Sequence, residues 1–240
     1  MISSSRQILY AALGLLVCLL VFEVTPLDLW VQQLFFDAST QQWLWSGTEP
    51  ISRLFLYDGI KKLLIVFALI LLISLFCCRY SVILHRYRSG IRIVLLSLLL
   101  VPLSVSALKV TTNVACPRAL AGFGGKLPYV GVLEPYPAGQ QPPHRQRCFP
   151  AGHASGGFAL LSLFFLFKSN RNRKRALAFA LVIGWLMGSY KMLIGDHFLS
   201  HTLVSMLLAW LIINAIVKVD VCWPRSLHAH PVIAKEGNTT

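Results

Sequence analysis

The stretch LLIVFALILLISLFCC, residues 63–78, carries no charged side chain over its whole length. Such a run is typical of a helix that crosses a lipid bilayer, whose hydrocarbon core takes about 20 residues to span. The composition agrees, because 56% of the residues are hydrophobic, only 13% are charged, and the mean hydropathy is +0.66. These values do not fit the surface of a water-soluble protein.

Comparable apolar runs recur along the chain, and together they predict six spans, at about 8–22, 63–78, 93–108, 154–167, 176–195 and 199–217. We therefore expect an all-α integral membrane protein with six transmembrane helices in a single membrane domain, residues 1–240. Arg6 before the first run also allows a signal peptide, but FEVTPLDLW offers no small-x-small cleavage site. We expect an uncleaved anchor.

The basic residues are distributed unevenly about these spans. The chain has 22 Lys and Arg against 9 Asp and Glu, and thirteen of the 22 fall on the side of the N-terminus, many in the basic inner loops 79–92 and 168–175. The positive-inside rule then places both termini in the cytoplasm and the outer loops, 24–62 and 111–152, in the periplasm of a bacterial inner membrane. We expect no nucleic-acid partner, because the cation-rich loops are short and mostly lack interleaved aromatic residues.

The two outer loops differ in character. In the first, LDLWVQQLFFD (27–37) sets apolar residues at helical spacing, which fits a surface-lying amphipathic helix or equally a loop rich in interfacial aromatics. The second is rich in proline and glycine, which predicts irregular structure. It also holds Cys116 and Cys148, which share an oxidising compartment, so we predict a disulfide between them.

Ionisable residues stand near the outer ends of the predicted spans, where each needs a partner or a function. They are Lys109, His153, Lys191 and His197. Singly, each has an ordinary explanation as a snorkelling lysine or a packed histidine. Together, cations and imidazoles suit a phosphate, since cations stabilise the transferring group and imidazoles attack phosphorus or protonate the leaving oxygen. Gly152 would open a helix whose N–H groups face the anion.

A zinc site is the competing interpretation. His197 and His201 share one helical face at i, i+4, and His153 or Cys148 would supply a third ligand. A zincin motif needs glutamate where Phe198 stands, and the nearby lysines disfavour a cation. We expect no metal and no cofactor.

Three segments, KVTTNVACPR (109–118), FPAGHAS (149–155) and SYKMLIGDHFLSH (189–201), together resemble the motifs of the type-2 phosphatidic acid phosphatase superfamily of membrane lipid phosphatases. The family motifs are Lys, six residues, Arg-Pro; then Pro-Ser-Gly-His; then Ser-Arg, five residues, His, three residues, Asp. The motifs cover the chain from Lys109 to His201, and their order matches.

The resemblance implies that His197 is the nucleophile, that His153 is the general acid, and that Lys109, Arg118 and Lys191 hold the phosphate. The chain departs from the motifs at several positions. Arg118 follows the proline instead of preceding it, Ala151 replaces serine, Lys191 replaces arginine, and His201 stands where the family has aspartate. His201, Asp196 or Glu134 is a candidate to replace that aspartate.

The resemblance thus implies a metal-independent phosphatase acting on a lipid phosphate or diphosphate, of the phosphatidate, polyprenyl or lipid A type, in contact with membrane lipids. A lipid-to-lipid phosphotransferase would use the same residues, and a non-enzymatic lipid carrier on a degenerate phosphatase fold would explain the substituted motif positions. The sequence does not choose among the lipids, and it leaves the oligomeric state open.

Overall fold

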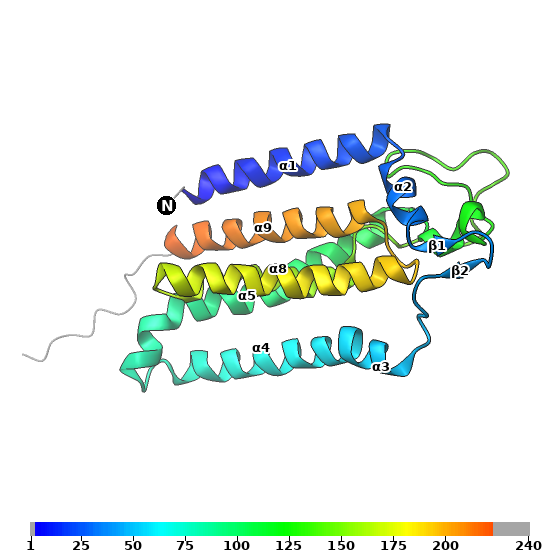
Figure 1. The fold of residues 1–240 in the computed structure, drawn as a ribbon. Helices are drawn as coiled ribbons and strands as arrows, with labels where there is room; N and C mark the ends of the chain where they lie inside the picture. The colour runs from blue at the N-terminus through cyan, green and yellow to red at the C-terminus, as the bar shows by residue number, and fades with distance from the viewer. Residues whose placement is uncertain (1–2, 223–240) are drawn as a thin grey trace, which may run out of the picture.

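The computed structural model describes residues 3–222. Its long helices lie roughly side by side in one bundle (Figure 1). They are α1 (Ser4–Val24), α4 (Ile60–Cys77), α5 (Val82–Thr111), α8 (Asn170–Leu193) and α9 (Leu199–Cys222). Within the described residues these five are long and apolar enough to cross a membrane. The chain is therefore mainly α-helical, as predicted.

The predicted fourth span, 154–167, is a shorter and interrupted rod. It consists of α6 (Gly152–Ala159), a 3₁₀ turn η4 (Leu160–Ser162) and α7 (Leu163–Leu166). α6 packs against α5, α8 and α9, so its backbone is surrounded by protein and need not cross the hydrocarbon by itself. The described chain thus contains five long apolar helices and one short one, and the count of six spans stays a prediction.

Two helices begin inside the segments that we predicted as inner loops. The inner loops were expected at 79–92 and 168–175, but α5 starts at Val82 and α8 at Asn170. Ser81 and Ser169 cap these starts, since their side chains accept hydrogen bonds from the backbone N–H groups of Leu84 and Asn172. Most of the basic residues therefore lie inside α5 or in the first two turns of α8, where a search for apolar runs does not detect a helix.

The inner helices pack at very short distances through glycine. An added Cβ at Gly157 of α6 would lie 2.7 Å from the Cα of Gly184 in α8, and one at Gly184 would lie 2.2 Å from the ring of Phe158. Small residues allow such close contact between helices in a membrane, where packing replaces the hydrophobic effect as the main attraction. The central helix α6, which carries His153, is held at this contact.

The first outer loop folds into small elements at one end of the bundle. These are α2 (Leu27–Gln33), the antiparallel pair β1 (Phe36–Asp37) and β2 (Gln42–Trp43), α3 (Pro50–Arg53) and a π turn η1 (Leu54–Gly59). The second outer loop contributes two 3₁₀ turns, η2 (Pro117–Ala119) and η3 (Ala121–Phe123), and is otherwise irregular. Both lie at the end of the bundle opposite the start of α1 and the end of α9 (Figure 1).

Of the two interpretations of 27–37, the helix forms over the first part of the segment, as α2, but with an orientation that the pattern did not predict. Its buried side chains are the polar Asp28 and Gln32, while Trp30 is exposed. The helix therefore turns its polar residues toward the protein, where they find partners on α8 and α9.

Candidate active site

The three motif segments meet through backbone hydrogen bonds at the end of the bundle opposite the start of α1. The Arg118 N–H donates to the Gly195 carbonyl at 3.0 Å, and the Ala151 N–H donates to the His201 carbonyl at 3.1 Å. Residues more than 45 positions apart in the sequence are thus fixed relative to one another by main-chain contacts. Such contacts do not depend on side-chain rotamers, so they give the site a rigid frame.

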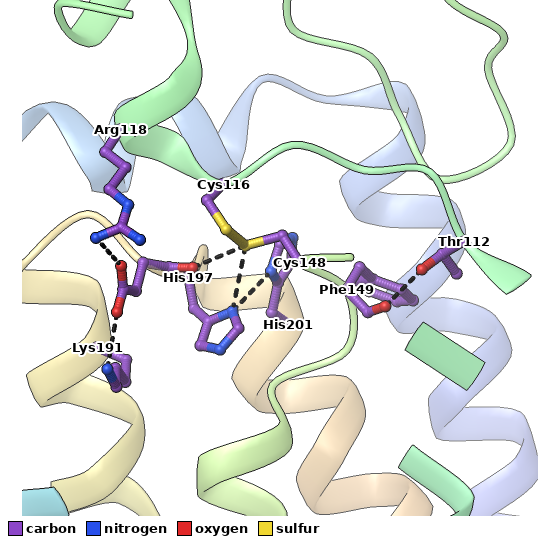
Figure 2. The surroundings of a disulfide bond; sticks show 9 residues. Thr112, Cys116, Arg118, Cys148, Phe149, Lys191, His197 and His201 are labelled. Carbon is purple, nitrogen blue, oxygen red and sulfur yellow. Dashed lines mark hydrogen bonds and ion pairs between the residues drawn. A yellow bond between two sulfur atoms is a disulfide. The ribbon is translucent and has the colours of Figure 1, made fainter. Parts of the chain in front are cut away.

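The predicted disulfide is present. Cys116 and Cys148 are bonded, with their Cα atoms 5.2 Å apart (Figure 2). The bond links the start of η2, which carries Arg118, to the irregular segment that leads into α6. Cys148 Sγ also lies 2.8 Å from the Asp196 carbonyl oxygen. A disulfide sulfur has no proton to donate, so this is a packing contact. It brings the disulfide against the loop between α8 and α9, residues 194–198, which carries His197 and is called the histidine loop below.

The two histidines of the third motif contact each other directly. Nδ1 of His197 lies 3.3 Å from Nδ1 of His201, and both side chains are buried (Figure 2). The ring of His201 also makes a hydrogen bond to the backbone of Cys148 and packs edge-on against Phe149 and Phe198. Of the three candidates for the missing aspartate, His201 is the one that touches His197.

The other two candidates are engaged elsewhere. Glu134 accepts a hydrogen bond from the Gly131 N–H within its own turn. Asp196 binds the two cations Lys191 and Arg118.

His197 is held neutral by its surroundings. It lies in the loop between α8 and α9, and burial, reinforced by the nearby His201, Lys109, His153 and Lys191, holds its pKa well below the ordinary value. A neutral imidazole keeps a lone pair at neutral pH. If Nδ1–H of His197 donates to His201, the lone pair is on Nε2, and the ring is a competent nucleophile.

Two of the predicted phosphate-binding cations converge on one carboxylate. Lys191 Nζ and Arg118 Nη1 each lie 2.8 Å from a different oxygen of Asp196. Lys191 is buried at the end of α8, whereas the Arg118 side chain is 61% exposed. The pair therefore already surrounds an anionic group with one buried and one exposed cation.

The remaining predicted residues lie on α5 and α6. Lys109 is in the last turn of α5, and an added Cβ at Gly152 would lie 3.6 Å from its ammonium nitrogen. The ring centroids of His153 and His197 are 6.3 Å apart, too far for a direct hydrogen bond. In-line phosphoryl transfer puts the attacking and leaving atoms on opposite sides of phosphorus, and a gap between the two rings is compatible with that geometry.

A possible metal cluster falls at the same place. Ligand atoms of Cys148, His197 and His201 lie within 4.8 Å of one another, which is the group that the sequence suggested as an alternative. The Cys148 sulfur is bonded to Cys116, however, and zinc takes cysteine as a thiolate. The oxidised protein thus offers this group two ligands instead of three.

The sequence did not single out two residues of α2 that hold the histidine loop at both ends. The carboxylate of Asp28 accepts hydrogen bonds from the Ser200 backbone N–H, at 2.9 Å, and from the Ser200 hydroxyl. Gln32 Nε2 donates a hydrogen bond to the Met192 carbonyl oxygen at 2.8 Å. Asp28 thereby acts as a cap for α9 from a distant part of the chain. The sequence signal that could have identified them is their spacing, because Asp28 and Gln32 stand at i, i+4 and therefore on one face of α2.

Comparison with protein families matches residues 90–221, more than half of the chain, to the PAP2 superfamily. The matched range contains all three motif segments that meet at the site. The chain belongs to the PAP2 superfamily. Comparison with curated proteins and with solved structures gave no match.

Membership of the PAP2 superfamily indicates a general class of activity. PAP2 proteins are generally phosphatases that act on phosphate esters, often those of lipids. In this PAP2 protein, His197, His153, Lys109 and Lys191 stand at motif positions and at one end of the bundle. The matched range starts at Gly90, so α1, α2, the β-hairpin and α4 lie outside it.

Proposed function

We propose that this PAP2 protein is a metal-independent lipid phosphate phosphatase that works through a phosphohistidine intermediate. The substrate is a phosphomonoester or diphosphate of a lipid, of the phosphatidate, polyprenyl or lipid A type. The site faces the periplasm of a bacterial inner membrane, with both termini in the cytoplasm. No cofactor takes part, and the oligomeric state is left open.

The observation that carries the proposal is the carboxylate of Asp196 between Lys191 and Arg118, one residue before His197. A carboxylate and a phosphate share the property of negative oxygens that bind cations through charge-assisted hydrogen bonds. Cations that hold one can hold the other, and here they stand beside a neutral buried imidazole. This arrangement suits charge stabilisation during phosphoryl transfer.

The chemistry follows from the residues. Lys109, Lys191 and Arg118 bind the phosphate oxygens, and Nε2 of His197 attacks phosphorus. His153 gives a proton to the leaving lipid oxygen as the P–O bond breaks. The same residue then takes a proton from the water that attacks the phosphohistidine, which releases phosphate and restores His197. His201 accepts a hydrogen bond from Nδ1–H of His197 and thereby fixes the orientation of the His197 ring. Because His201 is neutral, it adds no negative charge beside the nucleophile.

Phosphate release by purified protein in detergent, with chelator present, tests the proposal against its rivals. Release from a panel of lipid phosphates supports the phosphatase. Transfer that needs a second lipid as acceptor would indicate a phosphotransferase, and absence of turnover would indicate a lipid carrier.

The roles of the two histidines are tested by rapid mixing with labelled substrate, which should trap an acid-labile phosphate on the protein. This label should disappear in His197→Ala. His153→Ala should retain more activity on an aryl phosphate than on a lipid phosphate, because a good leaving group needs less protonation. A label that persists in His197→Ala removes that residue from the mechanism.

A further inference from the structure

A pocket of about 690 Å³ lies between residues 41–48, which comprise β2 of the hairpin and the turn that follows it, and the cation pair of Arg118 and Lys191. Gln42, Trp45, Ser46 and Thr48 line it from the hairpin side, and Arg118 and Lys191 line it from the helix bundle. Small-molecule sites commonly have volumes of about 300 to 1,000 Å³. The pocket is thus large enough for a head group several times the size of a phosphate.

The hairpin is fixed against the histidine loop and is not a loose cover. Gly195 has a φ of 73°, and an added Cβ would lie 2.4 Å from the Trp43 indole. Trp43 and Phe36 pack against Phe123 of η3, with ring centroids 5.5 and 5.4 Å apart. The wall of the pocket is therefore pre-formed by contacts on both sides.

The lining chemistry favours a neutral, hydroxyl-rich ligand. Trp45 is 43% exposed and offers an apolar ring face together with an indole N–H. The Gln42 amide both donates and accepts hydrogen bonds, and so do the hydroxyls of Ser46 and Thr48, which lie 2.7 Å apart. A sugar matches this set, since its hydroxyls bond to amides and hydroxyls and its C–H face packs on an aromatic ring. The charged side chains of the lining, Arg118, Lys191 and Asp196, pair with one another, so the rest of the lining is neutral.

We propose that this pocket binds the sugar of a glycolipid whose phosphate is attached directly to that sugar and is held by Lys191 and Arg118. This inference rests on the proposed function and narrows its substrate class. In phosphatidate the phosphate is attached to glycerol, and in a polyprenyl phosphate it is attached to the prenyl chain. Neither lipid has a sugar next to the phosphate, so each would leave the pocket filled with water. The hairpin lies before residue 90, outside the family match, so the subsite belongs to this chain's own N-terminal part.

Steady-state kinetics on matched substrates test the subsite. Wild-type protein should have a higher kcat/KM for a disaccharide lipid 1-phosphate than for phosphatidate or a polyprenyl phosphate. Trp45→Ala and Gln42→Ala should each raise the KM for the sugar substrate about ten-fold and change phosphatidate kinetics less than two-fold. Trp30→Ala is the matched control, because Trp30 is an exposed tryptophan of the same outer segment that does not line the pocket. Equal losses on both substrates, or none, overturn the proposal.

A binding measurement separates this inference from the proposed function. Calorimetry with glucose 1-phosphate and with glycerol 3-phosphate should show tighter binding of the sugar phosphate, and Trp45→Ala should remove the difference. If no lipid phosphate is hydrolysed but this preference is found, the phosphatase proposal fails and the sugar subsite stands. If hydrolysis occurs and both ligands bind alike in wild type and variant, the subsite is wrong and the phosphatase stands.

Discussion

His197, in the loop before α9, and His201, in the first turn of α9, have their Nδ1 atoms 3.3 Å from each other. In the motif that this chain resembles, the second position is an aspartate, which would add a negative charge and favour the protonated nucleophile. The chain instead places a neutral ring there. The pair keeps the orienting contact but not the charge, and this difference is measurable.

The first prediction concerns the pH dependence of this pair. Because the pKa of His197 is held well below its ordinary value, the acidic limb of kcat/KM should lie well below pH 6.5 in the wild type. His201→Asp should raise the pKa of His197 and move that limb to higher pH, whereas His201→Asn, which adds no charge, should not. His201→Leu should lower kcat. Profiles recorded from about pH 4 to 9 decide the matter, and identical limbs in wild type and His201→Asp would refute the assignment.

A second prediction concerns the buried cation of the clamp. Lys191→Ala should lower kcat ten-fold or more, which corresponds to a lost transition-state contact of about 1.4 kcal/mol or above. Lys191→Arg should retain much of the activity, because a guanidinium can bind the same oxygens. Lys126→Ala, which changes an exposed lysine, is the control. Wild-type kinetics in Lys191→Ala would assign this lysine a packing role.

A third prediction concerns the disulfide that links the first and second motifs. Its 32-residue separation corresponds to about 3 to 4 kcal/mol of stabilisation if the bond acts by constraining the unfolded chain. The double variant Cys116→Ser, Cys148→Ser should therefore unfold at lower temperature and lose activity, because Arg118 and His197 are positioned on either side of the bond. Cys77→Ser, at an exposed free cysteine, should behave as wild type. Peptide mapping without reduction should recover the linked pair.

The fourth prediction concerns the distant cap of α9. Asp28→Ala should destabilise the protein by about 1 to 2 kcal/mol, typical of a lost helix cap, and should lower kcat by loosening the loop that carries His197. Asp28→Asn should be milder, since its amide oxygen still accepts from the Ser200 N–H. Gln33→Ala, at an exposed position of the same helix, serves as control.

The same carboxyl has a predictable pH effect. Burial raises the pKa of Asp28 to about 6 from 3.8, so the folded protein binds its proton more tightly than the unfolded chain does. The contribution of Asp28 to stability therefore falls as pH rises from about 4 to 6. Thermal unfolding of the wild type and of Asp28→Asn should show that the variant becomes more stable relative to the wild type as pH rises from about 4 to 6. A difference in stability that does not change with pH would contradict this prediction.

The fifth prediction concerns topology. A single cysteine placed at Asn172, at the exposed start of α8, in a cysteine-free background should resist an impermeant reagent in intact cells. The reason is the basic segment KSNRNRKR, 168–175, which the positive-inside rule keeps in the cytoplasm. A cysteine at Leu133, in the other loop cluster and 79% exposed, should react. Labelling of a cysteine at position 172 would show that the orientation in the membrane is the reverse of the one proposed.

Much of the architecture was predictable from the sequence. Helices α1, α4, α5, α8 and α9 were found from apolar runs, because a bilayer forces backbone groups to pair within a long helix. The disulfide was predictable from compartment alone, and the motif segments from their order and spacing. Helix ends were less predictable, since a polar first turn such as that of α8, which begins NRNR, is fixed by a serine cap and not by hydropathy.

Only the tertiary structure decided how the site is held. The sequence could not tell which of His201, Asp196 and Glu134 contacts His197, because that depends on how the loop between α8 and α9 turns at Gly195. It also gave no reason for Asp28 and Gln32 to face inward, since their partners on α8 and α9 are more than 150 residues away. Local pattern determines which segments are helical. The pairing of distant polar groups depends on the packed fold, where each buried carboxylate or amide must find a partner.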